Sequence, residues 1–421
     1  MHRKVLSIAH HHVITPIREF LQDSRSVGII LIAFTIISLF LSNNSFTSEA
    51  YISFFHTSVT ITAGSVNLPE SPLSWINDVL MTLFFFLVAM EIKRELTIGE
   101  LASIKKSLLP VLAAFGGMVC PAIIYTFFNG NTDYHHGWGI PMATDIAFSL
   151  GVLSLLGKKV PVQLKIFLAA LAIIDDLGAV VTIAVFYTSK IQLIYLLGAI
   201  GSIGMVLLFN YLKLQRIFLY IIPGVALWYC LFNSGVHPTI AGVMMAFSMP
   251  LSKLEKLERI LHFPVNFIIM PLFALANTAI LLPSDFSNVF DSSVSYGVML
   301  GLIIGKPVGI FLFSYIATKA GIASLPSNTN YKQLWGIGML GGIGFTMSIF
   351  TSTLAFSVES LQVISKVSII GATLISSVIG YAYLKLLKAA PLKSKYAEDA
   401  SIVESLDNLA LELNPTISMA E

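Results

Sequence analysis

The sequence contains few charged residues: Asp, Glu, Lys and Arg together make up 11% of its 421 residues, whereas soluble globular domains carry about 25%. Hydrophobic residues make up 56%. This balance excludes a cytosolic enzyme with a membrane anchor and predicts a chain whose main partner is the lipid bilayer. The 25 basic and 23 acidic residues nearly cancel, so the basic surplus that is typical of nucleic-acid binding is also missing.

Cysteine is equally scarce. Cys120 and Cys230 both lie inside apolar runs, where packing is a commoner role than redox chemistry, and two cysteines are too few for a disulfide framework. The sequence lacks the Cys/His cluster that is typical of a zinc site, and we expect no cofactor. The consecutive histidines His10, His11 and His12 belong to a polar N-terminal arm, where such a run is more often solvated than metal-bound.

Long apolar runs recur along the chain, and a helix needs about 20 such residues to cross the bilayer. They fall near residues 26–42, 73–92, 107–129, 138–156, 162–188, 193–212, 217–232, 236–250, 263–283, 294–318, 334–356 and 361–387. A β-barrel would instead show alternating hydrophobicity in segments of about 10 residues. The sequence therefore predicts an all-α polytopic membrane protein with about 12 transmembrane helices.

The basic residues test this map, because loops that stay in the cytoplasm retain Lys and Arg. Of the 25 basic residues, 21 fall in the N-terminal arm, the even-numbered loops and the C-terminal end. We therefore expect both termini in the cytoplasm, with an arm (1–25), a transmembrane domain (26–388) and a C-terminal tail (389–421). The first apolar run lacks a clear cleavage pattern, so we expect it to remain in the protein.

The first loop on the opposite side differs from the rest of the chain. In residues 59–68, alternating residues flank Ala63, Gly64 and Ser65. This pattern predicts a short β-hairpin in an otherwise helical protein.

Two adjacent aspartates, Asp175 and Asp176, lie well inside the fifth apolar run. An ionisable side chain at mid-bilayer costs at least about 2.5 to 3.5 kcal/mol on insertion scales, so these residues are functional candidates. Ala169 and Ala172 share a helical face with Asp176, so a neighbouring helix can approach it closely. The alternative, two carboxylates buried only for packing, is disfavoured by the same cost.

Two other runs are predicted to be interrupted helices. In the fourth run, Pro141 removes a helical hydrogen bond just before Thr144 and Asp145. In the eleventh run, five glycines fall between Gly336 and Gly344, which leaves the backbone free to break. Broken segments in corresponding places of two halves indicate inverted repeats with a binding site at the bilayer midplane.

Such a site needs buried charges of both signs, because the helix ends that meet there carry partial charges. Asp145 supplies the anion, and Lys306, midway through the tenth run, supplies the cation. We expect Lys306 to pair with a buried aspartate rather than to extend to the membrane surface, because its side chain starts too deep.

The oxygen atoms at this site suit a small, hard cation. Carboxylates, a threonine hydroxyl and freed backbone carbonyls are ligands that such cations prefer. Asp175 and Asp176 are expected to titrate as a coupled pair, so that protons and a cation compete for one site. Such competition, joined to alternating exposure of the site, is sufficient for antiport.

Seven motifs closely resemble those of the NhaA-type Na⁺/H⁺ antiporters of bacterial inner membranes. They are Trp75-Ile-Asn-Asp78, Glu91-Ile-Lys-Arg-Glu-Leu96, Ala143-Thr-Asp-Ile-Ala147, Ala172-Ile-Ile-Asp-Asp-Leu-Gly178, Ser234-Gly-Val-His237, Ile304-Gly-Lys-Pro307 and Gly341-Gly-Ile-Gly-Phe-Thr-Met-Ser-Ile-Phe350. The motifs occur in the same order, and the resemblance covers about Arg25 to Lys388. It implies inverted repeats with two discontinuous crossing helices, an architecture already established for that family.

The resemblance also implies a function. The chain would exchange cytoplasmic Na⁺, together with Li⁺, for external H⁺ in the bacterial inner membrane, in an electrogenic and pH-regulated way. Asp176 would be the principal Na⁺ and proton carboxylate, and Asp175 would alternate between Lys306 and the open site. Thr144 and Asp145 would line the crossing and balance its charges, and Lys306 would hold the empty state. The 59–68 hairpin would form a homodimer contact.

A pH-responsive cluster at the cytoplasmic face is a further implication of the resemblance. Its members would be Glu91, Lys93, Arg94, Glu95, Glu258 and His262. A solvated set of loop charges that obeys the positive-inside rule explains them equally well. Arg259 stands where some family members have histidine, and it cannot titrate near neutral pH. His237 either tunes the response or is a hydrogen-bonded core histidine, and the second interpretation is slightly favoured.

Two other functions fit less well. An intramembrane aspartyl protease would use two aspartates such as Asp145 and Asp176, but neither lies in a Gly-x-Gly-Asp motif, and Lys306 would have no role. A cation channel conducts through weak binding at several sites, whereas paired carboxylates and a buried lysine favour a site that binds and releases in turn.

Overall fold

The computed structural model describes residues 24–58, 67–188, 191–214, 216–283, 285–327 and 329–387. These residues form helices and connecting turns, and none of them belongs to a β-strand. The arm as far as residue 23, which includes His10–His12, lies outside the described residues. So do the C-terminal tail and residues 59–66 of the expected hairpin.

Eight helices in the described part of the chain are long and apolar enough to cross a membrane. Five of them are single helices: α3 (Ser24–Asn43), α7 (Ile104–Asn129), α9 (Val162–Phe186), α10 (Leu193–Tyr211) and α20 (Glu359–Leu386). The other three each consist of two α-helices joined by a π-helical segment. The first is α5 (Pro72–Ser74), η2 (Trp75–Leu80) and α6 (Met81–Thr97), and the second is α13 (Leu251–Pro264), η6 (Val265–Ile269) and α14 (Met270–Asn277). The third is α16 (Ser293–Leu300), η7 (Gly301–Gly305) and α17 (Lys306–Lys319). Shorter elements connect them: α4 (Ser48–His56), η3 (Glu100–Ala102), η5 (Gly157–Lys159) and α15 (Ser287–Phe290).

The four remaining apolar runs are shorter or broken. Helix α11 (Phe218–Ser234) has 17 residues and α12 (Ile240–Ser248) has nine. The fourth run forms a 3₁₀-helix, η4 (His135–Met142), followed by α8 (Ile146–Ser154). The eleventh run forms α18 (Tyr331–Gly341) and α19 (Phe345–Ala355), which are bent by 46° and count as a ninth candidate span if taken together. All twelve apolar runs therefore contain helix, but fewer of them than expected are continuous spans.

One predicted boundary is wrong. The ninth run was expected to begin near residue 263, with Lys253 and Arg259 in the preceding loop. Instead, the spanning helix extends over Leu251–Asn277, and both basic residues lie on its first segment, α13. That segment alternates charged and apolar residues at helical spacing, which a search for continuous apolar runs does not detect.

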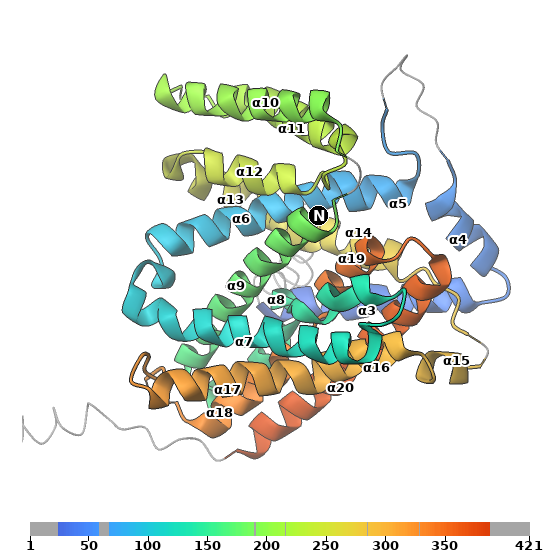
Figure 1. Ribbon diagram of the computed structural model, residues 1–421, viewed down its shortest axis with the longest axis vertical. Coiled ribbons are helices and arrows are strands. Elements are labelled where there is room, and N and C mark those ends of the chain that lie inside the picture. The colour runs from blue at the N-terminus through green and yellow to red at the C-terminus, as the bar shows by residue number, and fades with distance from the viewer. Residues whose placement is uncertain are drawn as a thin grey trace, which may run out of the picture.

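The helices form two groups that lie on either side of α9 (Figure 1). Helices α10 and α11 lie together at one edge beside α12 and α13, and α17, α18 and α20 lie at the opposite edge. Helices α7 and α17 pack very closely at Gly116 and Gly309. A Cβ atom built at Gly309 would lie only 2.0 Å from the carbonyl oxygen of Gly116, so a larger residue would not fit there. This glycine contact brings Lys306, at the first position of α17, deep into the packed interior.

Each broken segment is the middle one of three consecutive spans. The first set is α7, η4 with α8, and α9; the second is α16 with α17, α18 with α19, and α20. The two discontinuous helices of the expected fold are thus confirmed, and the charged residues lie where they meet.

Candidate functional site

The two helix breaks contact each other through the backbone. Residues Ala143–Asp145 separate η4 from α8, and residues Gly342–Gly344 separate α18 from α19. The amide of Asp145 donates a hydrogen bond of 2.7 Å to the carbonyl oxygen of Ile343. Because a broken helix leaves amide and carbonyl groups without helical partners, this bond satisfies one from each segment at the point of crossing.

Asp145 caps the N-termini of two half-helices at once. Its Oδ1 accepts a 2.9 Å hydrogen bond from the amide of Phe148 in α8, and its Oδ2 accepts one of 3.1 Å from the amide of Thr346 in α19. The Thr346 hydroxyl also donates to Oδ2. Helix N-termini carry partial positive charge. A single buried carboxylate therefore neutralises both ends.

Lys306 and Asp175 form an ion pair with no solvent exposure of either side chain. Thr144 joins them, because its hydroxyl oxygen accepts a 2.9 Å hydrogen bond from Lys306 Nζ. The same hydroxyl lies 2.7 Å from Asp175 Oδ2 and 2.9 Å from the carbonyl oxygen of Gly341, at the end of α18. Since a hydroxyl carries one proton, Thr144 donates to one of these two acceptors at a time.

Asp176, the next residue in α9, faces a different environment. It lines a cavity of about 510 Å³, together with Asp145 and Thr346. Its side chain is 2% exposed, and its Oδ1 has no hydrogen-bond partner. A buried carboxylate oxygen without a partner is rare and calls for an explanation.

The cavity has a second group of charged residues in its lining. Glu91, Arg94 and Glu95 from α6 and His262 from α13 contribute to its wall. Arg94 lies 3.1 Å from Glu258 Oε1 and 3.3 Å from Glu95 Oε1. Five of the six expected members of the pH-responsive cluster are therefore brought together. Arg259 follows Glu258 on α13 and is exposed.

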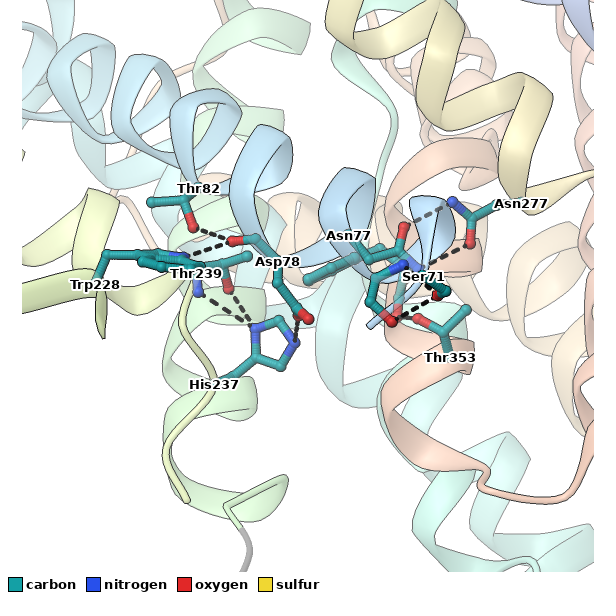
Figure 2. Close-up of polar contacts among 11 residues, drawn as sticks. Ser71, Asn77, Asp78, Thr82, Trp228, His237, Thr239, Asn277 and Thr353 are labelled. Atoms are coloured by element: carbon teal, nitrogen blue, oxygen red, sulfur yellow. Dashed lines mark hydrogen bonds and ion pairs between the residues drawn. The ribbon is translucent and has the colours of Figure 1, made fainter. Parts of the chain in front are cut away.

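Lys93 and His237 lie elsewhere. Lys93 Nζ donates to carbonyls at the C-terminus of α12, at 2.8 Å to Phe247 and also to Met249, the residue that follows the helix. This geometry is that of a cation at a helix C-terminus, where the partial charge is negative. His237 Nε2 lies 3.6 Å from Asp78 Oδ1, and its Nδ1 lies 2.8 Å from the Thr239 hydroxyl. Figure 2 shows the ring beside both side chains.

Thr346 was not among the residues predicted for the site. It occurred in a recognised motif, but its two hydrogen bonds to Asp145 depend on how α8 and α19 cross. A polar residue just after a glycine-rich break, where a half-helix begins, is the signal that would have identified it.

Broken helices that cross beside buried, ionisable side chains define a class of protein, the secondary transporters. The family model described as Na⁺/H⁺ antiporter 1 matches residues 18–384. The chain therefore belongs to this family, whose members are antiporters and not enzymes. The resemblance seen in the sequence motifs is confirmed, and the chain is a multi-pass membrane protein of a bacterial antiporter family.

Individual relatives agree over nearly their whole length. The chain is 48% identical over 383 residues to Na⁺/H⁺ antiporter NhaA 1 of Clostridium beijerinckii, which covers 89% of this chain and 96% of the relative. It is 45% identical over 388 residues to Na⁺/H⁺ antiporter NhaA of Cytophaga hutchinsonii, and the match covers 91% of this chain and 98% of the relative. It is 44% identical over 378 residues to Na⁺/H⁺ antiporter NhaA of Citrobacter koseri, and the match covers 88% of this chain and 97% of the relative.

Proposed function

We propose that the chain exports Na⁺, and also Li⁺, from the bacterial cytoplasm in electrogenic, pH-regulated exchange for external protons, and that both bind at Asp175 and Asp176. Na⁺/H⁺ exchange is the activity of its family. The observation that carries the detailed proposal is that Asp176, whose Oδ1 has no hydrogen-bond partner, lines the cavity, whereas Asp175 does not.

Asp176 binds either a proton or a cation. Two carboxylates, a hydroxyl and a backbone carbonyl at the crossing are hard oxygen ligands, and they match Na⁺ and Li⁺. A proton on Asp176 removes its negative charge, so protonation and cation binding exclude each other. This competition couples the two fluxes without a second binding site.

Asp175 changes partner during the cycle. In the empty state it pairs with Lys306 and with the hydroxyl of Thr144. When a cation enters, Asp175 turns toward it and Lys306 loses its partner. Asp145 keeps the crossing neutral throughout, because it caps α8 and α19 and lies in the same cavity wall. Asp175 and Asp176 act as a coupled pair that together releases more than one proton for each cation bound, which makes the exchange electrogenic.

The orientation follows from the positive-inside rule, with both termini and the charged wall of the cavity on the cytoplasmic side. Glu91, Arg94, Glu95, Glu258 and His262 respond to cytoplasmic pH and control access to Asp176. Lys93 acts on this cluster indirectly, through its contacts with the end of α12. His237 adjusts the response from its place beside Asp78. Two copies associate through the 59–68 hairpin.

The test is Na⁺-driven collapse of an imposed pH gradient in proteoliposomes that contain the full chain. Na⁺ and Li⁺ should dissipate an acid-inside gradient, and K⁺ should not. A membrane potential set in the direction of net charge movement should accelerate the exchange. The series should run from about pH 6.5 to 8.5, the range in which histidine and perturbed carboxyl groups titrate.

Three outcomes separate the parts of this proposal. Exchange that rises steeply with pH supports both the transport site and the pH-responsive cluster. Exchange that is flat with pH supports the transport site and contradicts the pH-responsive cluster. The absence of exchange in a folded protein contradicts the transport proposal itself.

A further inference from the structure

The fourth apolar run reaches its break through an unusual helix. The segment η4 is 3₁₀-helical over eight residues, whereas 3₁₀-helices longer than three or four residues are uncommon. Gly137, Gly139 and Pro141 are poor helix formers, so η4 has little helical stability of its own. Its length and position therefore depend on contacts with its neighbours.

Two tyrosine hydroxyls hold the beginning of η4. Tyr187, which follows the last residue of α9, donates a 2.7 Å hydrogen bond to the carbonyl oxygen of His136. Tyr125 on α7 is completely buried and donates one of 2.8 Å to the carbonyl oxygen of Tyr134, the residue before η4. We call these two hydrogen bonds the tyrosine contacts. They join the fourth run to α7 and α9, the spans that precede and follow it in the chain.

Two buried glycines of η4 leave room for these hydroxyls. A Cβ atom at Gly139 would lie 2.8 Å from the Tyr187 hydroxyl oxygen, and its next neighbours would be methyl groups at 3.4 and 3.5 Å. A Cβ atom at Gly137 would lie 2.2 Å from the Tyr125 hydroxyl oxygen, 2.7 Å from the ring carbon that carries it, and 2.8 Å from Phe356. Each phenol thus occupies the space that a side chain on η4 would need.

The fourth run and α9 meet a second time at the break, where the Thr144 hydroxyl lies 2.7 Å from Asp175 Oδ2. Tyr187 follows Asp175 by twelve residues, which is about 18 Å at the α-helical rise of about 1.5 Å per residue. From His136 to Thr144, six residues at the 3₁₀ rise of about 2.0 Å and two non-helical residues at about 3.3 Å give about 19 Å. An α-helix in place of η4 would make this distance about 3 Å shorter. The extended form of η4 therefore matches the distance between the two contacts.

From this match, we propose that Tyr187 is a positioning residue for the transport site. Its hydroxyl, supported by that of Tyr125, keeps η4 extended, so that the Thr144 hydroxyl reaches Asp175 at the break. The proposal rests on the transport function assigned to Asp175 and Asp176. Neither tyrosine touches the transported ion, and both act through the position of Thr144.

The other broken run is held differently and supplies a matched control. Helix α18 is a regular α-helix with a capping box, in which the side chains of Asn330 and Gln333 each accept a hydrogen bond from the other residue's amide. Its first residue, Tyr331, has a hydroxyl 2.8 Å from that of Thr318. Because α18 is capped by its own residues, Tyr331→Phe removes a tyrosine hydroxyl without releasing the helix.

The first experiment measures Na⁺-driven proton flux in proteoliposomes over a series of Na⁺ concentrations. Tyr187→Phe removes one oxygen atom, so η4 can shorten and draw Thr144 away from Asp175. The KM for Na⁺ should rise about two- to tenfold, the range that corresponds to one lost hydrogen bond, while the maximal rate stays near that of wild type. Tyr331→Phe should leave the KM unchanged. An unchanged KM in folded Tyr187→Phe overturns the proposal, as does an equal rise in both variants.

The second experiment tests the contact between Tyr187 and η4 by rescue. Gly139→Ala places a methyl group against the Tyr187 oxygen, so it should lower the unfolding midpoint and raise the KM for Na⁺. The φ angle of Gly139 is not positive, so alanine adds crowding without backbone strain. Adding Tyr187→Phe removes the nearest atom and leaves the next at 3.4 Å. The double variant should therefore be more stable than Gly139→Ala alone, and its KM should return to that of Tyr187→Phe.

Gly137→Ala is the control for this rescue. The ring carbon of Tyr125 and Phe356 both crowd that position, so removing the Tyr125 hydroxyl should not restore stability. If Tyr187→Phe fails to rescue Gly139→Ala, the proposal is wrong. It is also wrong if Tyr125→Phe rescues Gly137→Ala to the same extent, because the effect would then not depend on the contact at Gly139.

The unfolding midpoints do not depend on whether the chain exchanges Na⁺. Wild-type exchange together with an unchanged KM in Tyr187→Phe contradicts only the positioning role. Rescue of the unfolding midpoint without wild-type exchange confirms the contact and contradicts the transport function on which the positioning role rests.

Discussion

Asp175 and Asp176 are neighbours in one helix with the same side chain, yet they have opposite surroundings. Asp175 is held by Lys306 and Thr144 and has no solvent exposure. Asp176 lines a cavity, and the Oδ1 atom of each aspartate has no hydrogen-bond partner. Successive residues in an α-helix point about 100° apart. One step along α9 is therefore enough to separate a carboxylate that is paired with a lysine from one that lines the cavity.

This division explains why a pair of carboxylates is useful at such a site. A lone buried charge would be too costly at membrane depth, whereas a fully paired one would have nothing left to bind. Here the lysine stabilises one carboxylate, and the other remains free. The predictions below test whether the two aspartates differ in function as they do in environment.

The largest effect is expected from Asp176→Asn. The amide is nearly isosteric, but it can neither bind a proton for exchange nor attract a cation by charge, so Na⁺-driven proton flux in proteoliposomes should fall to the level of protein-free liposomes. The thermal unfolding midpoint should change little, because Asp176 Oδ1 makes no hydrogen bond that the substitution could break. Retained exchange would refute the role of Asp176.

A smaller effect on transport and a larger one on stability are expected from Lys306→Ala. Removing one partner of a buried ion pair typically costs about 3–5 kcal/mol, because the remaining charge is left uncompensated. The unfolding midpoint should therefore drop well below that of Asp176→Asn, while Na⁺ still stabilises the protein. Lys306→Arg is the control that keeps the charge. Equal midpoints for Lys306→Ala and wild type would show that the pair does not stabilise the fold.

The residues themselves predicted the ionisable side chains of this site, whereas the pairing of Asp175 with Lys306 was expected only from the resemblance to the antiporter family. Asp145, Asp175, Asp176 and Lys306 stood out because charge is rare inside apolar runs. Which aspartate pairs with Lys306 depends on the rotation of α9 and on the close contact of Gly116 with Gly309. Those are properties of helix packing, and residue spacing within one run does not determine them.

The fold was predictable to a similar extent. All twelve apolar runs contain helix in the described residues, but only eight of the expected twelve are candidate spans, or nine with the bent pair. Pro141 and the glycines at 336–344 located both breaks. The sequence did not predict that the ninth helix begins at Leu251, because α13 carries charged residues and so does not form a continuous apolar run. The placing of Lys93 at the carbonyls of α12 was also missed, since the positive-inside rule counts basic residues without regard to their partners.

The smallest effect is expected from Thr144→Val, which changes only the surroundings of Asp175. Valine keeps the shape of threonine but loses the hydroxyl that joins Lys306, Asp175 and Gly341. A lost hydrogen bond to a charged group is worth about 1.5–3 kcal/mol, so the unfolding midpoint should fall by less than in Lys306→Ala. Asp176 keeps its charge and its cavity, and exchange should persist with a raised KM for Na⁺. A loss of exchange as complete as in Asp176→Asn would mean that Thr144 is indispensable for binding, and that the two aspartates act as a single unit rather than as one held and one free carboxylate.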